Sequence, residues 1–466
     1  MFAIGPILLE VIFVLLKPQE LYEFLTVIQP LYTLPGLIVL GFVFDSGRFG
    51  IRAGNVTLAP YFRIALFFFG WCLLTVILRA PQQLTAQAIL FGTSVLMAMA
   101  IAHGVQTWRL YRIFAASMLA LTLLLSFVGT HQATAPFKCM WIDPVDRTVL
   151  HYDGHPCAGP EQTLECERDD GHERDWVCEH SGLMNTSSVS GRIRFRGNLE
   201  DPNELALTVG IGFPFAIAFF TRRKTVLRGL LVAGSFVLIG SCVFYSQSRG
   251  GQLVLLLVLA TYFVRRFGWR WGGVAGALAA VPLLILASMG GRSESEAEGS
   301  ALERIECLQV GLDLVRSSPL FGVGKGQFGE YHFLTAHNSF VLAAAETGLV
   351  GFAAWSFVIY LAVKIPISAL RALKGVEGPD AEEGRTWSTA MLASMVGLVV
   401  GSFFLSFSFH AILWIYVGLT GALAGVLRKQ LPEWRVGLSR KEMGGIVFAN
   451  LALLAAIFVY ARIKIG

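Results

Sequence analysis

The chain has 466 residues, of which 55% are hydrophobic and only 15% are charged, and its mean hydropathy is +0.61. This composition is too apolar for an ordinary soluble protein and is typical of a polytopic membrane protein. The net charge of +5 does not indicate a nucleic-acid partner, because the basic residues stand beside apolar runs.

Long apolar runs predict about 12 transmembrane helices, and therefore an all-α membrane helix bundle. In chain order they cover residues 2–16, 31–45, 61–79, 84–102, 110–128, 204–221, 229–246, 251–264, 272–289, 339–363, 388–407, 411–427 and 444–461. Several are shorter than the ~20 residues that cross ~30 Å of hydrocarbon, so tilted or re-entrant segments remain alternatives. The first run lacks a basic flank and a cleavage site, which favours a retained helix over a signal peptide.

Basic clusters follow several of these runs, at Arg222–Lys224, Arg265–Arg266 and Arg428–Lys429. The positive-inside rule places such loops in the cytoplasm, so the alternate loops are expected outside. Five parts are therefore predicted. They are N-terminal membrane helices (1–128), a large extracytoplasmic loop (129–203), central membrane helices (204–289), a second extracytoplasmic loop (290–338) and C-terminal membrane helices (339–466).

The large loop carries four cysteines, Cys139, Cys157, Cys166 and Cys178. In an oxidising compartment they predict two disulfides, with three pairings open. A zinc site is the alternative, because four histidines are interleaved with them, His151, His155, His172 and His180. The spacing fits no compact zinc finger, which favours disulfides.

Three arginines, Arg192, Arg194 and Arg196, follow the cysteines directly and precede a helix start at Asp201–Glu204. Basic residues on the outer side run against the positive-inside bias. Their partners are either lipid headgroups or a bound phosphate, which guanidinium groups bind through paired hydrogen bonds.

Arg249 stands in a short loop, Ser246–Gly251, between two apolar runs. One interpretation is an arginine that reaches the headgroups or marks a helix end. The other is a fixed cation at the membrane surface that stabilises negative charge on a phosphate leaving group.

The stretch from Glu303 to Gly351 is the most polar interruption of the apolar sequence. Apolar residues at helical spacing predict an amphipathic helix over 303–317 that lies on the membrane surface. A glycine-rich segment, Phe321–Gly329, follows, and it lacks the strand and the Ser/Thr context of a P-loop. We therefore interpret it as a loop whose glycines permit tight turns or close contacts, and not as a nucleotide-binding site.

His337 follows this loop at the start of the next apolar run. It either packs at the helix start or accepts a proton, which suits an imidazole whose ordinary pKa is about 6.5. Arg304 either anchors the amphipathic helix or contacts phosphate. Glu346 lies in an apolar run, where a carboxylate needs a partner, and it is expected to orient an arginine or the histidine. His410 is a second candidate base.

Several of these stretches together resemble the O-antigen ligase and polymerase family. They are Arg304, Pro319–Phe328, His337–Ser339, Glu346–Gly351, Arg196–Ala206 and Ser246–Gly251. The family comprises bacterial membrane glycosyltransferases that use undecaprenyl-diphosphate-linked glycans. The cysteine-containing loop is not part of the family pattern.

This resemblance implies an enzyme of the bacterial inner membrane whose active site faces the periplasm or exterior. Its donor would be an undecaprenyl-diphosphate-linked glycan and its acceptor a lipid, a glycan or a protein. His337 would be the base, Arg249 and Arg196 would bind the diphosphate, and three further arginines would assist, Arg192, Arg194 and Arg304. No Asp-x-Asp pair has a convincing metal context, and Asp169–Asp170 lies in the extra loop, so inverting transfer without a metal or cofactor is expected. A polymerase, a polysaccharide or lipid transporter, and a structural membrane protein are the alternatives.

Overall fold

A computed structural model of the chain describes residues 2–22, 24–49, 56–143, 150–159, 166, 175–271 and 294–465. Within these ranges ten helices are long and apolar enough to cross a membrane. They are α3 (Pro30–Phe49), α4 (Phe62–Arg79), α5 (Leu84–Gly104), α6 (Trp108–Thr134), α7 (Pro202–Arg222), α8 (Val226–Tyr245), α9 (Arg249–Phe267), α12 (Ser339–Ala372), α14 (Ala411–Gln430) and α15 (Arg440–Ile465). The predicted all-α membrane bundle is confirmed.

Shorter or more polar helices complete the fold. They are α1 (Ile4–Leu16), α2 (Phe24–Ile28), α11 (Glu294–Ser317), α13 (Pro379–Gly401) and the 3-10 turns Pro18–Glu20, Pro81–Gln83, Leu183–Asn185, Gly197–Leu199 and Phe328–Glu330. Every predicted apolar run other than 272–289 coincides with a helix, and that run lies outside the described residues.

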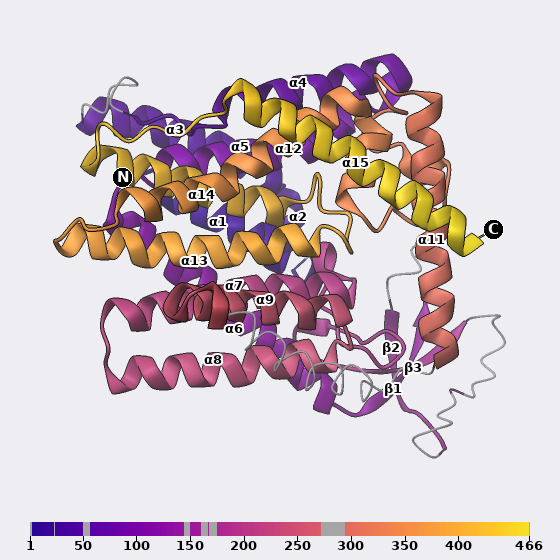
Figure 1. Cartoon of the computed structure of the whole chain (residues 1–466). Coiled ribbons are helices and arrows are strands. Elements are labelled where there is room, and N and C mark those ends of the chain that lie inside the picture. Colours follow the sequence, from indigo (N-terminus) through magenta and orange to yellow (C-terminus); the bar gives the residue numbers. More distant parts are fainter. Residues whose placement is uncertain are drawn as a thin grey trace.

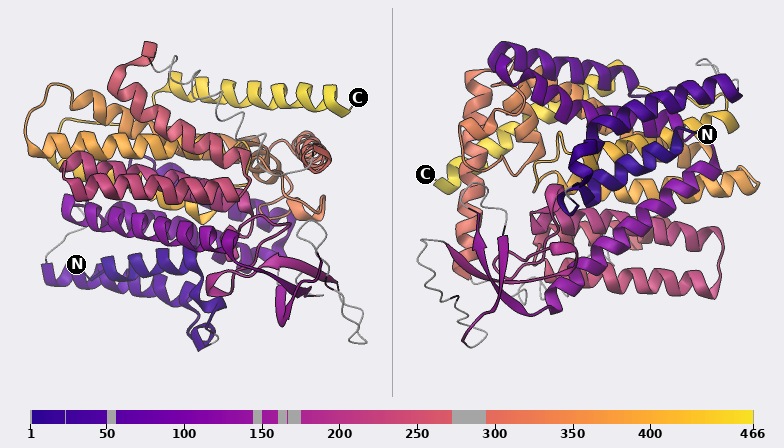
Figure 2. Two further views of the ribbon diagram at one scale, coloured as in Figure 1. Left: turned by 90° about the horizontal axis from the view of Figure 1, so that it is seen from below. Right: turned by 180° about the vertical axis from the view of Figure 1, so that it is seen from behind.

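Most helices run side by side, and the strands and a crossing helix gather at one end of the bundle (Figures 1 and 2). Strands β1 to β3 and helix α11 lie at this end, which we call the sheet end, and α11 crosses it at a steep angle to the bundle helices. The α7–α8 and α12–α13 connections lie at the opposite end. A helix is thus present over the predicted range 303–317, as part of a longer helix that packs on α12 and α15, while its position on a membrane surface stays a prediction.

Helix α14 forms the centre of the bundle, because it is buried along most of its length. Its glycines permit close approach: a Cβ at Gly418 would lie 2.8 Å from the Ala98 carbonyl oxygen of α5. The Tyr61 hydroxyl donates to the Val417 carbonyl at 2.6 Å. Small residues and satisfied polar groups at helix contacts are how bundles pack in lipid, where apolar burial between helices gains little.

Helix α13 is held at the end opposite the sheet by an ion cluster. Glu383 accepts from Arg112 of α6 at 2.9 Å and from Arg222 of α7 at 3.1 Å. One carboxylate thereby joins three helices that are far apart in sequence.

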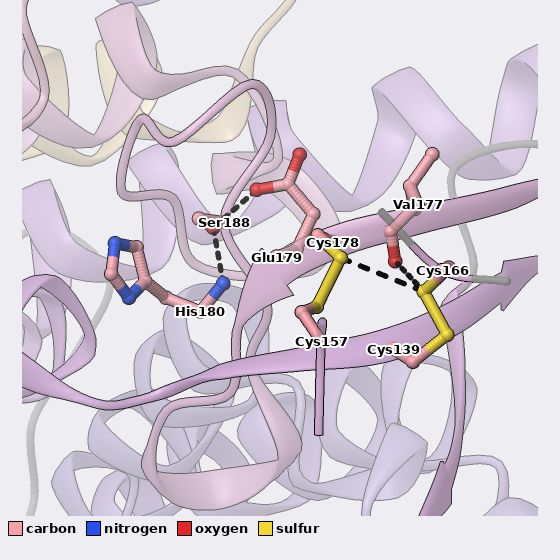
Figure 3. Close-up of a disulfide and its surroundings, with 8 residues drawn as sticks. All are labelled: Cys139, Cys157, Cys166, Val177, Cys178, Glu179, His180 and Ser188. Carbon is pink, nitrogen blue, oxygen red and sulfur yellow. Dashed lines mark hydrogen bonds between the residues drawn. A yellow bond between two sulfur atoms is a disulfide. The ribbon is translucent and has the colours of Figure 1, made fainter. Parts of the chain in front are cut away.

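The large loop contains a small antiparallel sheet that we did not predict. Its strands β1 (Phe137–Ile142), β2 (Leu150–Pro156) and β3 (Trp176–His180) are in the order β2-β1-β3. The four cysteines lie in or beside this sheet, paired as Cys139–Cys166 and Cys157–Cys178 (Figure 3). These cross-links close chain separations of 27 and 21 residues in a region with little apolar core.

The geometry of the histidines does not favour zinc. Cys157, Cys166 and Cys178 are the one group of metal-ligand type that the described residues bring together, and no histidine joins it. His151 instead bonds Asp143 at 3.0 Å, and His180 bonds the Ala135 carbonyl. His172 and Asp169–Asp170 lie outside the described residues.

We expect mass spectrometry of the unreduced protein to find the pairs Cys139–Cys166 and Cys157–Cys178. A thiol reagent applied without reductant should leave all four unlabelled. Each bond closes a loop long enough to contribute about 3 kcal/mol, so reduction should lower the melting temperature of the folded loop. Stoichiometric zinc together with ready labelling of the four thiols would contradict this pairing.

Candidate active site

Helices α7, α9 and α12 all begin at the sheet end of the bundle (Figure 1). Each is capped by a side chain suited to that role: Asp201 accepts from the Asn203 amide at 2.8 Å, Ser248 from Gly251 at 3.0 Å, and Asn338 from Phe340 at 3.0 Å. The starts of α7 and α9 line one small pocket together with Arg304 of α11 and the end of α13. Helix starts and the charge of Arg304 favour an anion beside this pocket, which is itself only about 10 Å³ in volume, whereas Asp201 and Glu204 add negative charge at the start of α7.

Arg249 is the first residue of α9, and its side chain is exposed. It makes no side-chain hydrogen bond or ion pair within the described ranges. A guanidinium that projects from a helix start without a protein partner retains its donors for an external anion.

Arg192 holds the loop that carries Arg249. Its Nε donates to the Ser246 carbonyl at 3.0 Å, and its terminal nitrogen donates to Asn203 Oδ1 at 3.3 Å. The side chain therefore ties the segment before α9 to the first turn of α7.

Arg304 connects the start of α9 with His337. It lines the pocket beside Ser248 and Gly250, and its charge acts on His337. The His337 ring is half-buried. Burial and the charge of Arg304 lower the pKa of His337 from its ordinary value of 6.5, while Asp201 and Glu303 oppose that shift. The imidazole is therefore neutral at pH 7, as a proton acceptor must be.

The backbone at His337 is unusual, with φ of 45° in the left-handed region. Such conformations persist where the surroundings enforce them. Here the Asn338 side chain donates to the Phe403 carbonyl at 3.2 Å, and Ser339 Oγ donates to the Leu405 carbonyl at 2.6 Å. The turn is thus fixed against the segment that follows α13.

Helix α12 is broken at Gly348, whose φ is 67°. The loop after α11 fills the break: Leu349 N–H donates to the Pro319 carbonyl at 2.8 Å, and Val323 N–H donates to the Ala345 carbonyl at 2.9 Å. A Cβ at position 348 would lie 2.1 Å from the Leu320 carbonyl oxygen, so only glycine fits.

The glycine-rich loop is also held by side chains. Glu346 accepts from the Phe328 N–H at 3.1 Å, and Arg79 Nε at the end of α4 donates to the Gly322 carbonyl at 3.1 Å. We expected Glu346 to orient an arginine or the histidine, but its hydrogen bond goes to the loop backbone. We did not predict that Arg79 would hold this loop, although a charged residue at the end of an apolar run is a signal visible in the sequence.

Arg194 and Arg196 donate hydrogen bonds to the backbone of the large loop. Arg194 is buried and donates through Nε to the Ser187 carbonyl at 3.0 Å, while Arg196 donates to the Met184 carbonyl. These hydrogen bonds lie within the large loop, and donor binding by either arginine remains a prediction.

His410 caps α14, because its Nδ1 accepts from the Ile412 N–H at 3.3 Å. Its ring stacks on Phe407. These contacts already give the second candidate base a structural role.

Taken together, the fold and the site define a multi-pass membrane protein whose candidate site, at one end of the bundle, contains arginines and a half-buried histidine. In agreement, residues 233–356 match the family model described as O-antigen ligase. This match confirms the resemblance for that segment, which contains Arg249, Arg304 and His337. No curated protein matches the chain. The family match supports an enzyme of O-antigen ligase or polymerase type, with a lipid-linked glycan and an acceptor as its general partners.

Proposed function

We propose that the protein transfers a glycan from an undecaprenyl-diphosphate carrier to an acceptor hydroxyl, at the outer face of the bacterial inner membrane. The observation that carries the proposal is the position of Arg304, between the start of α9 and His337. It places a positive charge near both the start of α9 and His337, within the segment that matches the family.

In this proposal the diphosphate lies at the starts of α7 and α9, where Arg249 and Arg304 donate to its oxygens. Negative charge grows on the diphosphate as its bond to the anomeric carbon breaks. Fixed guanidinium groups and helix-start N–H groups stabilise that charge without rearranging. The arginines thus take the part that Mg²⁺ plays in many glycosyl transfers, and no metal or cofactor is required.

His337 accepts the proton of the acceptor hydroxyl while the hydroxyl oxygen attacks the anomeric carbon from the side opposite the diphosphate. The new bond is a glycosidic C–O bond, the electron pair of the old bond leaves with undecaprenyl diphosphate, and the anomeric configuration inverts. The lowered pKa of His337 keeps the base in its neutral form before the reaction.

The acceptor decides between two versions of this function. A ligase passes the glycan to another lipid or a protein, whereas a polymerase passes it to a second lipid-linked repeat. The purified protein, reconstituted with a lipid-diphosphate-linked glycan and a panel of acceptors, should release undecaprenyl diphosphate and form a glycosylated product. Movement of an intact lipid-linked glycan across the bilayer without any new bond would instead establish a transporter.

We expect the acid limb of the kcat/KM profile to lie below pH 6.5, because the pKa of His337 is lowered in the free protein. Arg304→Gln should move this limb to higher pH, since it removes a nearby positive charge that disfavours imidazolium. Arg316→Gln is the matched control, because Arg316 is exposed on the same helix and pairs with Asp313. An acid limb unchanged in Arg304→Gln would show that another group titrates.

A further inference from the structure

An apolar groove runs along the side of the bundle, away from the candidate active site. It lies between α4 and α15, and the part of α12 that follows Gly348 forms its floor. Its volume is about 900 Å³, within the range of ligand-binding cavities. Apolar side chains supply most of the lining, among them Ile64, Phe67, Val350, Ala353, Phe357 and Val447.

Two arginines bound the groove at the end of the bundle opposite the sheet. Arg63 lies in the first turn of α4, is exposed and makes no side-chain hydrogen bond or ion pair among the described residues. Arg428 lies in the last turn of α14 and donates to the Leu58 carbonyl at 3.0 Å. Its Nε is buried and has no hydrogen-bond partner in the described part of the chain.

Among the described residues, no carboxylate forms an ion pair with either arginine. The residues that line the groove include no acid, and the nearby charged group that acts on Arg428 is a further arginine, Arg435. A buried N–H group without an acceptor is costly, and an anion bound at this end would supply the acceptor.

We propose that the groove binds an anionic phospholipid from the leaflet opposite the candidate active site. Its phosphate accepts from Arg63 and Arg428, and an acyl chain lies along the apolar lining toward Val350. A neutral lipid would fill the lining equally well, but its headgroup would bring no net charge to the arginines. The donor carrier is a different molecule, because its diphosphate is proposed to bind at the sheet end.

The test is native mass spectrometry of protein purified in mild detergent and then exposed to micelles of phosphatidylglycerol or phosphatidylcholine. The wild-type protein should retain phosphatidylglycerol at one per chain and at least tenfold less phosphatidylcholine. A double variant that carries Arg63→Gln and Arg428→Gln should retain at least tenfold less phosphatidylglycerol. Ala353→Phe, which fills the floor and leaves both arginines, should also reduce it.

Arg223→Gln is the matched control, since Arg223 is exposed at the same end of the bundle but does not line the groove. It should retain phosphatidylglycerol as the wild-type protein does. Melting temperatures in the same detergent establish that each variant is folded. Equal retention of both lipids, equal loss in the control, or an undecaprenyl lipid in place of the phospholipid would each overturn the proposal.

Discussion

Arg249→Ala is expected to lower the rate of glycan transfer by about a hundredfold or more, the usual effect of removing a donor that stabilises developing negative charge. The side chain is exposed and bonded to no described residue, so its removal leaves the bundle intact. Arg249→Lys should recover little activity, because an ammonium keeps the charge but lacks the planar fork that binds two phosphate oxygens. Transfer is measured with the reconstituted protein at saturating acceptor.

Arg316→Ala is the control for this variant. Arg316 is also an exposed arginine at the sheet end, but its partner is Asp313 on its own helix. Its loss should change transfer less than twofold. Near-normal transfer by Arg249→Ala, with the amount of protein in the membrane unchanged, would remove Arg249 from the proposed mechanism.

His337→Ala is expected to abolish transfer while donor binding persists, because the arginines hold the diphosphate and the histidine receives only the acceptor's proton. His337→Gln should resemble His337→Ala, since an amide is no base. Transfer by the wild-type protein should continue in EDTA. Binding of a fluorescent lipid diphosphate and product formation are measured on the same preparations.

His410→Ala is the matched comparison. It removes the cap of α14 and should cost about 1 kcal/mol of stability, but it should leave most of the transfer activity. Loss of donor binding in His337→Ala would move His337 into the binding site and leave the base unidentified. Substantial transfer by His337→Gln would show that hydrogen bonding suffices.

The bundle was predictable because lipid imposes a simple rule: a spanning segment must be apolar and must satisfy its own backbone. Each apolar run within the described ranges is therefore a helix. The sheet in the large loop followed no such rule. Its strands are five to seven residues long, and they depend on cross-strand pairing and on two disulfides, whose partners the sequence does not choose.

The site was predictable only in part. Arg249, Arg304 and His337 stood out as polar residues at the ends of apolar runs, and all three lie in the segment that matches the family. The bond from Arg192 to the Ser246 carbonyl joins residues 54 positions apart, and no local pattern reveals such a contact. Arg196 carried a stronger expectation than Arg192, yet its guanidinium bonds to Met184 within its own loop.

The break at Gly348 also bears on how the protein is made. Helix α12 has 34 residues, which would measure about 51 Å if unbroken, well over the ~30 Å of a hydrocarbon layer. Until Pro319–Phe328 docks, the break leaves backbone groups and the Glu346 carboxylate without partners, at a cost of several kcal/mol in lipid. Because this loop precedes α12 in the chain, it is already synthesised when α12 enters the membrane and can pack against the break. Substitutions in the loop should therefore reduce how much protein survives cellular quality control, before they change how fast each surviving molecule works.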